Sequence, residues 1–158
     1  MIKYLRVLIN EISSIKYKFI TNYPDTYLGL KLRKDYWRKK LKKSGENIQI
    51  RHGSGIGHPN LVEVGNNFIL GNNSLVTANS SNGIFIGNDV GIARNVLIHS
   101  ANHSFGNINI PIMKQEILSP KLSYNNRYYS IIIEDNVWIG SQSVILPGTF
   151  IKSGCVVS

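Results

Sequence analysis

The four histidines of this chain are its strongest candidates for chemistry. His99 and His103 stand four residues apart, and His52 and His58 lie farther upstream. A neutral imidazole can accept a proton from a hydroxyl group at cellular pH, which makes histidine a frequent general base. Imidazoles also bind zinc, but a zinc site needs three ligands that converge and one open position. Because Asp and Glu are scarce near these histidines, we favour a general base and expect no metal.

A repeat of six residues organises most of the chain and must position these side chains. An aliphatic residue, often followed by glycine, returns at every sixth position, and the series reads Val64, Leu70, Val76, Ile86, Ile92, Ile98, and then Ile133, Ile139, Ile145, Ile151, Val157. Neither an α-helix, with period 3.6, nor a half-buried strand, with period 2, predicts this spacing. Short repeats of fixed length are typical of solenoids, in which each repeat buries its apolar face against the next.

The residues between the aliphatic positions indicate the shape of each repeat. The residue four positions after each aliphatic is mostly small or medium in size, as in Ser74, Val90 and Cys155. Asn, Asp and Gly separate these positions, and they tolerate the left-handed backbone angles of tight corners. Three short strands and three corners per coil predict a triangular parallel β-helix, whose coils stack about 4.8 Å apart. Cys155 is expected to be a small buried side chain, not a nucleophile.

The six-residue step breaks after Ile98 and is running again at Ile133, which predicts an insertion from Asn102 to Ser130. Insertions in solenoids decorate one face and often carry the binding site. This insertion begins with Asn102 and His103, whereas His99 lies at the preceding corner. We therefore expect the chemistry between Ile98 and Ile131.

The N-terminal segment, residues 1–46, differs from the rest in charge and pattern. It holds twelve of the 18 Lys and Arg residues against four acids, and it lacks the repeat. Apolar residues at helical spacing over residues 2–20, and a break near Tyr23-Pro24-Asp25, predict two helices. Three roles are open, in this order: a cap on the first coil, a basic surface on anionic lipid, and a nucleic-acid contact. No base-reading group is visible, so we expect no nucleic-acid partner.

Composition limits the compartment. A single cysteine is typical of a reducing environment, and no apolar run approaches the ~20 residues that span a bilayer. We expect a cytoplasmic protein, with peripheral contact to the inner face of the membrane as the open alternative.

Three stretches resemble the hexapeptide-repeat acyltransferases, in their sugar O-acetyltransferase branch. They are Ile86 to Ile98, Asn102-His-Ser-Phe105 with Ile110-Pro-Ile112, and Ile133 to Gly148. The resemblance covers roughly residues 48–158. It implies an all-β solenoid, a left-handed parallel β-helix, behind an N-terminal basic helical segment. It also implies a homotrimer, with the active site between neighbouring subunits. The expected division is 1–46 for the basic segment and 47–158 for the acyltransferase domain, with the insertion at 102–130.

The resemblance also assigns roles to residues. His103 would be the general base that takes a proton from a sugar hydroxyl as the oxygen attacks the thioester of acetyl-CoA, and His99 is the alternative base. Asn79 falls roughly where related enzymes bind the acceptor. The residues expected along the pantetheine arm of CoA are Trp138, Gly140 and Ser141.

The expected function is transfer of an acetyl group from acetyl-CoA to a hydroxyl of a cell-envelope or capsular sugar, in polysaccharide biosynthesis. Two departures from the family pattern keep alternatives open. Gly106 and Asn107 stand where acidic residues are usual, and family members usually continue for another coil beyond Ser158. The alternatives are a non-catalytic interaction scaffold and an N-acyltransferase on the same fold.

Overall fold

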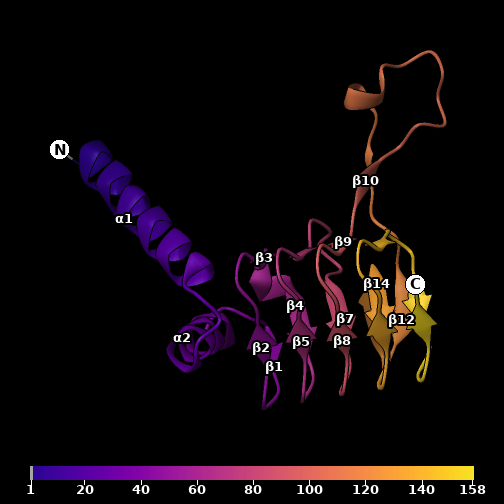
Figure 1. Ribbon diagram of the computed structural model, residues 1–158. Helices are drawn as coiled ribbons and strands as arrows, with labels where there is room; N and C mark the ends of the chain where they lie inside the picture. Colours follow the sequence, from indigo (N-terminus) through magenta and orange to yellow (C-terminus); the bar gives the residue numbers. More distant parts are fainter. Residues whose placement is uncertain (1) are drawn as a thin grey trace.

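The computed structural model describes residues 2–158 as two helices followed by a β-solenoid (Figure 1). The helices are α1 (Ile2–Asn22) and α2 (Tyr27–Arg38), and they are separated at the predicted break. Thr26 begins α2 as its N-cap, because its hydroxyl accepts a hydrogen bond of 3.2 Å from the Gly29 amide. None of the helices within residues 2–158 is long and apolar enough to cross a membrane.

The solenoid is a left-handed parallel β-helix of about five coils with three faces. Face A consists of β1 (Lys43–Ser44), β4 (Val62–Val64), β7 (Ile84–Ile86), β14 (Ile131–Ile133) and β17 (Phe150–Ile151). Face B consists of β2 (Gln49–Ile50), β5 (Ile69–Leu70), β8 (Gly91–Ile92), β15 (Trp138–Ile139) and β18 (Val156–Val157). Face C consists of β3 (Gly55–Gly57), β6 (Leu75–Thr77), β9 (Leu97–His99) and β16 (Val144–Ile145). Every pairing within these faces is parallel, and short helix η1 (Pro59–Leu61) connects β3, at the end of the first coil, to β4.

The six-residue aliphatics form the core, as the repeat predicts. On face B the register stacks Leu70 on Ile50 and Ile92 on Leu70, and all three are buried. The small inward residues complete the packing, since buried Ser74 donates its hydroxyl to the Ala93 carbonyl at 2.8 Å. Cys155 differs from the expectation: it is half-buried, because no further coil of the described chain stacks on it.

The corners are built by Asn and Asp in the left-handed region, where φ is 55° at Asn67 and 54° at Asp89. Their side chains also bond from coil to coil. Asn47 donates to Asn67 at 3.1 Å, and Asn67 donates to Asp89 at 2.7 Å. The turn-tolerant residues of the sequence therefore both turn the chain and connect successive coils.

The predicted insertion leaves the solenoid after β9 and returns at β14, and Figure 1 shows it as an arm that rises from the coils. It contains two antiparallel pairs. β10 (Asn102–His103) and β11 (Ile117–Leu118) form the base of the arm, whereas β12 (Leu122–Tyr124) and β13 (Arg127–Tyr129) lie beside the solenoid (Figure 1). Short helix η2 (Ile112–Lys114) lies in the arm. Because β14 still pairs with β7, the insertion does not interrupt the stacking.

The helical segment covers the first coil through α2, whose buried side chains are Arg33 and Trp37. Two details differ from the sequence interpretation. Strand pairing already begins at Lys43, within the segment expected to be helical. Arg33, counted with a basic surface, is completely buried and bonded to Asp25 and to main-chain carbonyls.

Candidate active site

His103 is held at the base of the insertion arm by the antiparallel pairing of β10 with β11. It lies opposite Ile117, and the next residue, Ser104, donates its amide to the Glu116 carbonyl at 2.8 Å. The Nδ1 atom of His103 is buried and has no hydrogen-bond partner within residues 2–158. Buried polar atoms are nearly always bonded, so an unpaired ring nitrogen at this position is unusual. The other ring nitrogen, Nε2, is neither buried nor bonded within residues 2–158, so it is the atom that an incoming group can reach.

His99 reaches the same region from the solenoid, at the end of β9 on face C. It stacks in register on Thr77, which stacks on Gly57. The column is tight, because a Cβ atom at position 57 would lie 2.9 Å from the Thr77 methyl group. The Thr77 hydroxyl is a second buried polar atom without a partner in the described chain. The parallel register thus fixes the backbone position of His99.

The two histidines line one open hollow of about 140 Å³ at the junction of arm and solenoid. Its lining residues are Asn79, His99, Ala101, Asn102, His103 and Ile117. The hollow therefore brings together both candidate bases and the candidate acceptor residue Asn79. No carboxylate lines it, in agreement with Gly106 and Asn107 in the positions where acids were expected. His52 and His58 lie elsewhere, and across residues 2–158 no three His, Cys, Asp or Glu residues are grouped as metal ligands.

The chemistry available in this hollow is proton transfer. Two histidines and two asparagines line a space large enough for the reacting part of a polar molecule. An imidazole with an unbonded nitrogen can accept the proton of a hydroxyl or amino group as that group becomes a nucleophile. The amide of Asn79 can donate to and accept from the same molecule.

Trp138 lies apart from the histidine hollow, on face B. Its half-exposed ring covers Gly91, where an added Cβ would come within 2.6 Å of the Trp138 Cε3 atom. A groove of about 510 Å³ runs beside it and is also lined by Asp89, Gly154 and Val156. The exposed part of the Trp138 ring gives this groove an apolar surface on which an extended chain could lie.

Gly140 and Ser141 follow Trp138 at the next corner. A Cβ at position 140 would stand 3.0 Å from the Val157 carbonyl oxygen, so coil stacking by itself favours a small residue there. Ser141 is exposed and lines neither the groove nor the histidine hollow. Within one chain, the residues expected to bind CoA are therefore not brought to the candidate bases.

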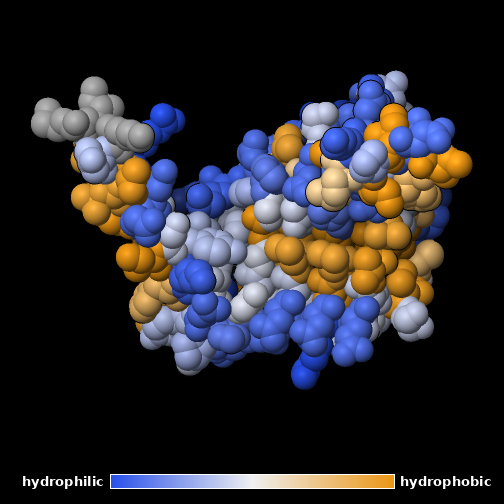
Figure 2. All heavy atoms as spheres, turned by 90° about the horizontal axis from the view of Figure 1, so that it is seen from above, coloured by the Kyte–Doolittle hydropathy of each residue, from blue (hydrophilic) through white to orange (hydrophobic). Residues whose placement is uncertain are grey.

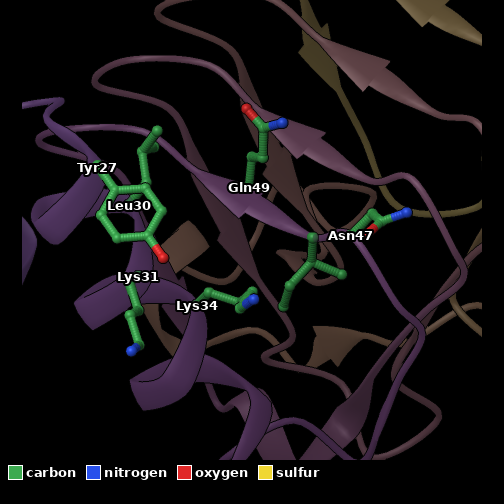
Figure 3. Close-up of a pocket in the computed structure, with 7 residues that line it drawn as sticks. Tyr27, Leu30, Lys31, Lys34, Asn47 and Gln49 are labelled. Atoms are coloured by element: carbon green, nitrogen blue, oxygen red, sulfur yellow. The ribbon is translucent and has the colours of Figure 1, made fainter.

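A third hollow, of about 320 Å³, was not foreseen from the sequence. It lies between α2 and the first coil, and Figure 3 shows Tyr27, Lys31 and Lys34 extending from α2 opposite Asn47 and Gln49. Its lining has no histidine or carboxylate to accept a proton. We therefore place the chemistry at the histidine hollow.

Glu63 is the buried carboxylate of the described chain, and it is a structural residue. Burial alone would raise its pKa, but a 2.8 Å contact with the Lys42 ammonium, the hydroxyl of Tyr129 and the charge of Arg127 together hold its pKa below the ordinary value. These partners come from the helical segment and from the insertion. Glu63 thus connects the helical segment and the insertion to strand β4. It does not line the histidine hollow.

Comparison with known proteins identifies similar solved structures. No protein-family model matches the chain, and no curated protein matches it. A maltose O-acetyltransferase from Clostridium difficile 630 superposes with a TM-score of 0.63 at 25% identity, over 98% of this chain and 78% of that one. AntD, an N-acyltransferase from Bacillus cereus in complex with dTDP and 3-hydroxybutyryl-CoA, superposes with a TM-score of 0.57 at 16% identity, over 78% of this chain and 73% of that one. Both are acyltransferases of the hexapeptide-repeat type, and the fold of this chain is theirs.

Proposed function

We propose that this protein transfers an acetyl group from acetyl-CoA to a hydroxyl of a sugar destined for the cell envelope or capsule. One observation carries the proposal: the hollow that joins His99, His103 and Asn79 on a fold shared with acyltransferases. The likeness to a sugar O-acetyltransferase supports an acceptor hydroxyl. Acetyl-CoA is available in the cytoplasm, where we place the reaction.

In the proposed mechanism His103 is the general base. Its accessible ring nitrogen, Nε2, takes the proton of the acceptor hydroxyl while the oxygen bonds to the acyl carbon. The imidazolium then returns that proton to the departing sulfur, so that His103 ends the cycle neutral. Acetyl-CoA supplies the activated acyl carbon and a thiolate leaving group. A serine nucleophile is unnecessary, because the acceptor oxygen attacks directly.

Asn79 is proposed to bind the acceptor, since it lines the hollow with an amide that can donate and accept hydrogen bonds. Trp138, Gly140 and Ser141 are proposed to lie along the pantetheine arm of CoA. The Trp138 ring packs over Gly91 and stays half exposed, and its exposed part fits an apolar chain. His99 is kept as the alternative base.

We propose a homotrimer as the active form, because one chain separates the Trp138 groove from the histidine hollow. Face C carries an outward column of exposed aliphatic side chains, Leu75, Leu97 and Val144, in strand register up to the candidate site. Figure 2, seen from above, shows a hydrophobic band across the solenoid. The arm also exposes apolar residues, among them Phe105, Ile108 and Met113. A neighbouring copy on this face would cover these surfaces and bring a second solenoid to the hollow.

The test is acyl transfer by the purified chain. Acetyl-CoA is incubated with a panel of hexoses, hexosamines and nucleotide sugars, and free thiol is measured with Ellman's reagent. We expect thiol release that depends on the sugar, and a product that gains one acetyl mass and loses it in mild alkali, as an ester does. Absence of both CoA binding and thiol release would leave the non-catalytic scaffold as the function.

Transfer to an amine is the second candidate, and the likeness in fold to AntD is the observation that raises it. The same imidazole could take a proton from an amino group during attack. An alkali-stable acetylated product, formed only with amino sugars, would decide for the amide and against the ester.

A further inference from the structure

Helix α1 presents an uncovered apolar stripe. Residues 4–16 are all exposed, and in Figure 1 the helix points away from the solenoid. The stripe consists of residues at helical spacing whose exposed fractions lie between 54% and 67%: Leu5, Leu8, Ile9, Ile12, Ile15 and Phe19. Figure 2 shows hydrophobic residues gathered along helix α1. Large side chains on one side of a helix indicate a surface that is normally covered.

The end of α1 that joins the body is firmly fixed. Ile20 and Thr21 are buried, and Thr21 accepts a 2.9 Å hydrogen bond from the Gly53 amide through its carbonyl. The Tyr17 ring meets the Trp37 ring edge-on, with centroids 6.1 Å apart. The direction of the stripe is therefore set by the solenoid, while the solenoid itself leaves the stripe uncovered.

The charges beside the stripe indicate what covers it. At 3.6 residues per turn, Lys16 falls within the stripe, between Leu5 and Ile9. Arg6 lies beyond Ile9 on one side of the stripe, and Lys18 lies beyond Glu11 on the other. Glu11 is the one acid of α1. Lys16 also shares a hollow with Lys39 and Lys40, which follow α2. Long basic side chains can extend to lipid phosphates while their methylene groups remain in apolar surroundings.

We propose that α1 is a membrane-surface helix that inserts its apolar stripe into the headgroup region of an anionic bilayer. An amphipathic helix with basic edges lies in the plane of the interface, with its apolar side roughly 5–10 Å deep. The length and composition of α1 do not allow a span, so it rests on one leaflet. This inference is independent of acyl transfer. Joined to the proposed function, it would hold the hollow near lipid-linked acceptors.

Charge argues against a second copy of α1 as the partner. Residues 1–46 hold twelve basic and four acidic residues, so that two such segments repel each other. Anionic lipid attracts the same charges, because its headgroups are negative. An anionic lipid surface can therefore cover the apolar stripe and also attract the basic residues around it.

The test is co-sedimentation of the full chain with large vesicles of phosphatidylcholine, with or without 30 mol% phosphatidylglycerol. We expect binding to the anionic vesicles that weakens as salt is added, because exposed charges are screened over about 10 Å at 0.1 M salt. The double variant Ile12→Gln/Ile15→Gln should bind at least about tenfold more weakly, since two large side chains lose their apolar environment. The matched control is Asn10→Gln/Ser14→Gln, which uses the same residue type on the opposite side of α1.

Three results would overturn the proposal. They are equal binding to neutral and anionic vesicles, no binding to either, or equal loss in the stripe variant and its control. Sedimentation velocity without lipid excludes the other partner: if the stripe variant changes the oligomer size and the vesicles bind neither protein, the stripe contacts another copy. Both variants should melt at the wild-type temperature, since the altered side chains are exposed.

Discussion

The Nε atom of Arg33 donates to the carbonyl oxygen of Ile50 over 2.6 Å and joins helix α2 to the end of strand β2. The same guanidinium bonds to the Tyr23 carbonyl and to the Asp25 carboxylate, so that one side chain ties the helix, the connection before it and the first coil. Burial lowers the pKa of Arg33, while the charge of Asp25 opposes that shift. The cap is held by a satisfied buried cation as well as by apolar packing.

We predict that Arg33→Met destabilises the protein by about 3 kcal/mol, because it leaves Asp25 and the Ile50 carbonyl without their partner. The value is at the low end for a broken buried pair, since the Asp25 side chain keeps 25% exposure. Urea unfolding measures the loss. Lys34→Met, on the same helix, should change stability by less than about 0.5 kcal/mol. Equal effects in the two variants would refute the anchoring role.

We predict that His103→Ala lowers kcat about 10²–10⁴-fold, the usual cost of a lost general base, with little change in CoA affinity. His99→Ala should have a smaller effect. Steady-state kinetics on the best acceptor and calorimetry with CoA provide the two readouts. His52→Ala, outside the hollow, is the control. Normal turnover in His103→Ala with an inactive His99→Ala would exchange the two roles.

Glu63 should make the protein sensitive to acid. Its folded pKa lies below the unfolded value of 4.5, so its carboxylate contributes stability above pH 4.5 that is lost as the pH falls through the folded pKa. Glu63→Gln should therefore be less stable than wild type at pH 7, with the difference shrinking on acidification to pH 3. Urea titrations across this range measure it. Glu46→Gln, at an exposed position, should differ little from wild type at either pH. A gap that stays constant with pH would contradict this account.

Gly91→Ala should weaken CoA binding while the coil remains folded. The new Cβ would collide with the Trp138 ring, a side chain that can move, and not with the backbone. We expect a higher KM for acetyl-CoA with kcat little changed, and a shift in tryptophan fluorescence. Gly106→Ala meets nothing within 4 Å and is the control. A shifted fluorescence with unaltered KM would remove Trp138 from the proposed CoA site.

Leu97→Glu should dissociate the proposed trimer, because it places a charge in the exposed aliphatic column of face C. Sedimentation velocity should show a smaller species, and activity should fall with it. Val156→Glu changes an exposed aliphatic on face B and should leave the mass unchanged. Trimers that persist in Leu97→Glu would place the subunit interface elsewhere.

The solenoid could be predicted from the sequence because its information is local. Each coil repeats the same choices, an aliphatic inward and an Asn or Asp corner, so Leu70 and Asn67 already indicate their environment without knowledge of distant partners. The insertion was visible for the same reason, as the place where the repeat stops. The structure confirms the coils, the corners and the N-terminal helical segment.

The surroundings of individual side chains depended on which coils stack and where the arm returns. Arg33 looks like any other member of a basic run, yet it is buried because the first coil closes over it. Asn79 meets His99 and His103 because β6 stacks on β9 and β10 folds back from the arm. Trp138 lies away from them, on another face of the prism. A six-residue period determines which residues face inward, but long-range stacking alone decides which outward residues become neighbours.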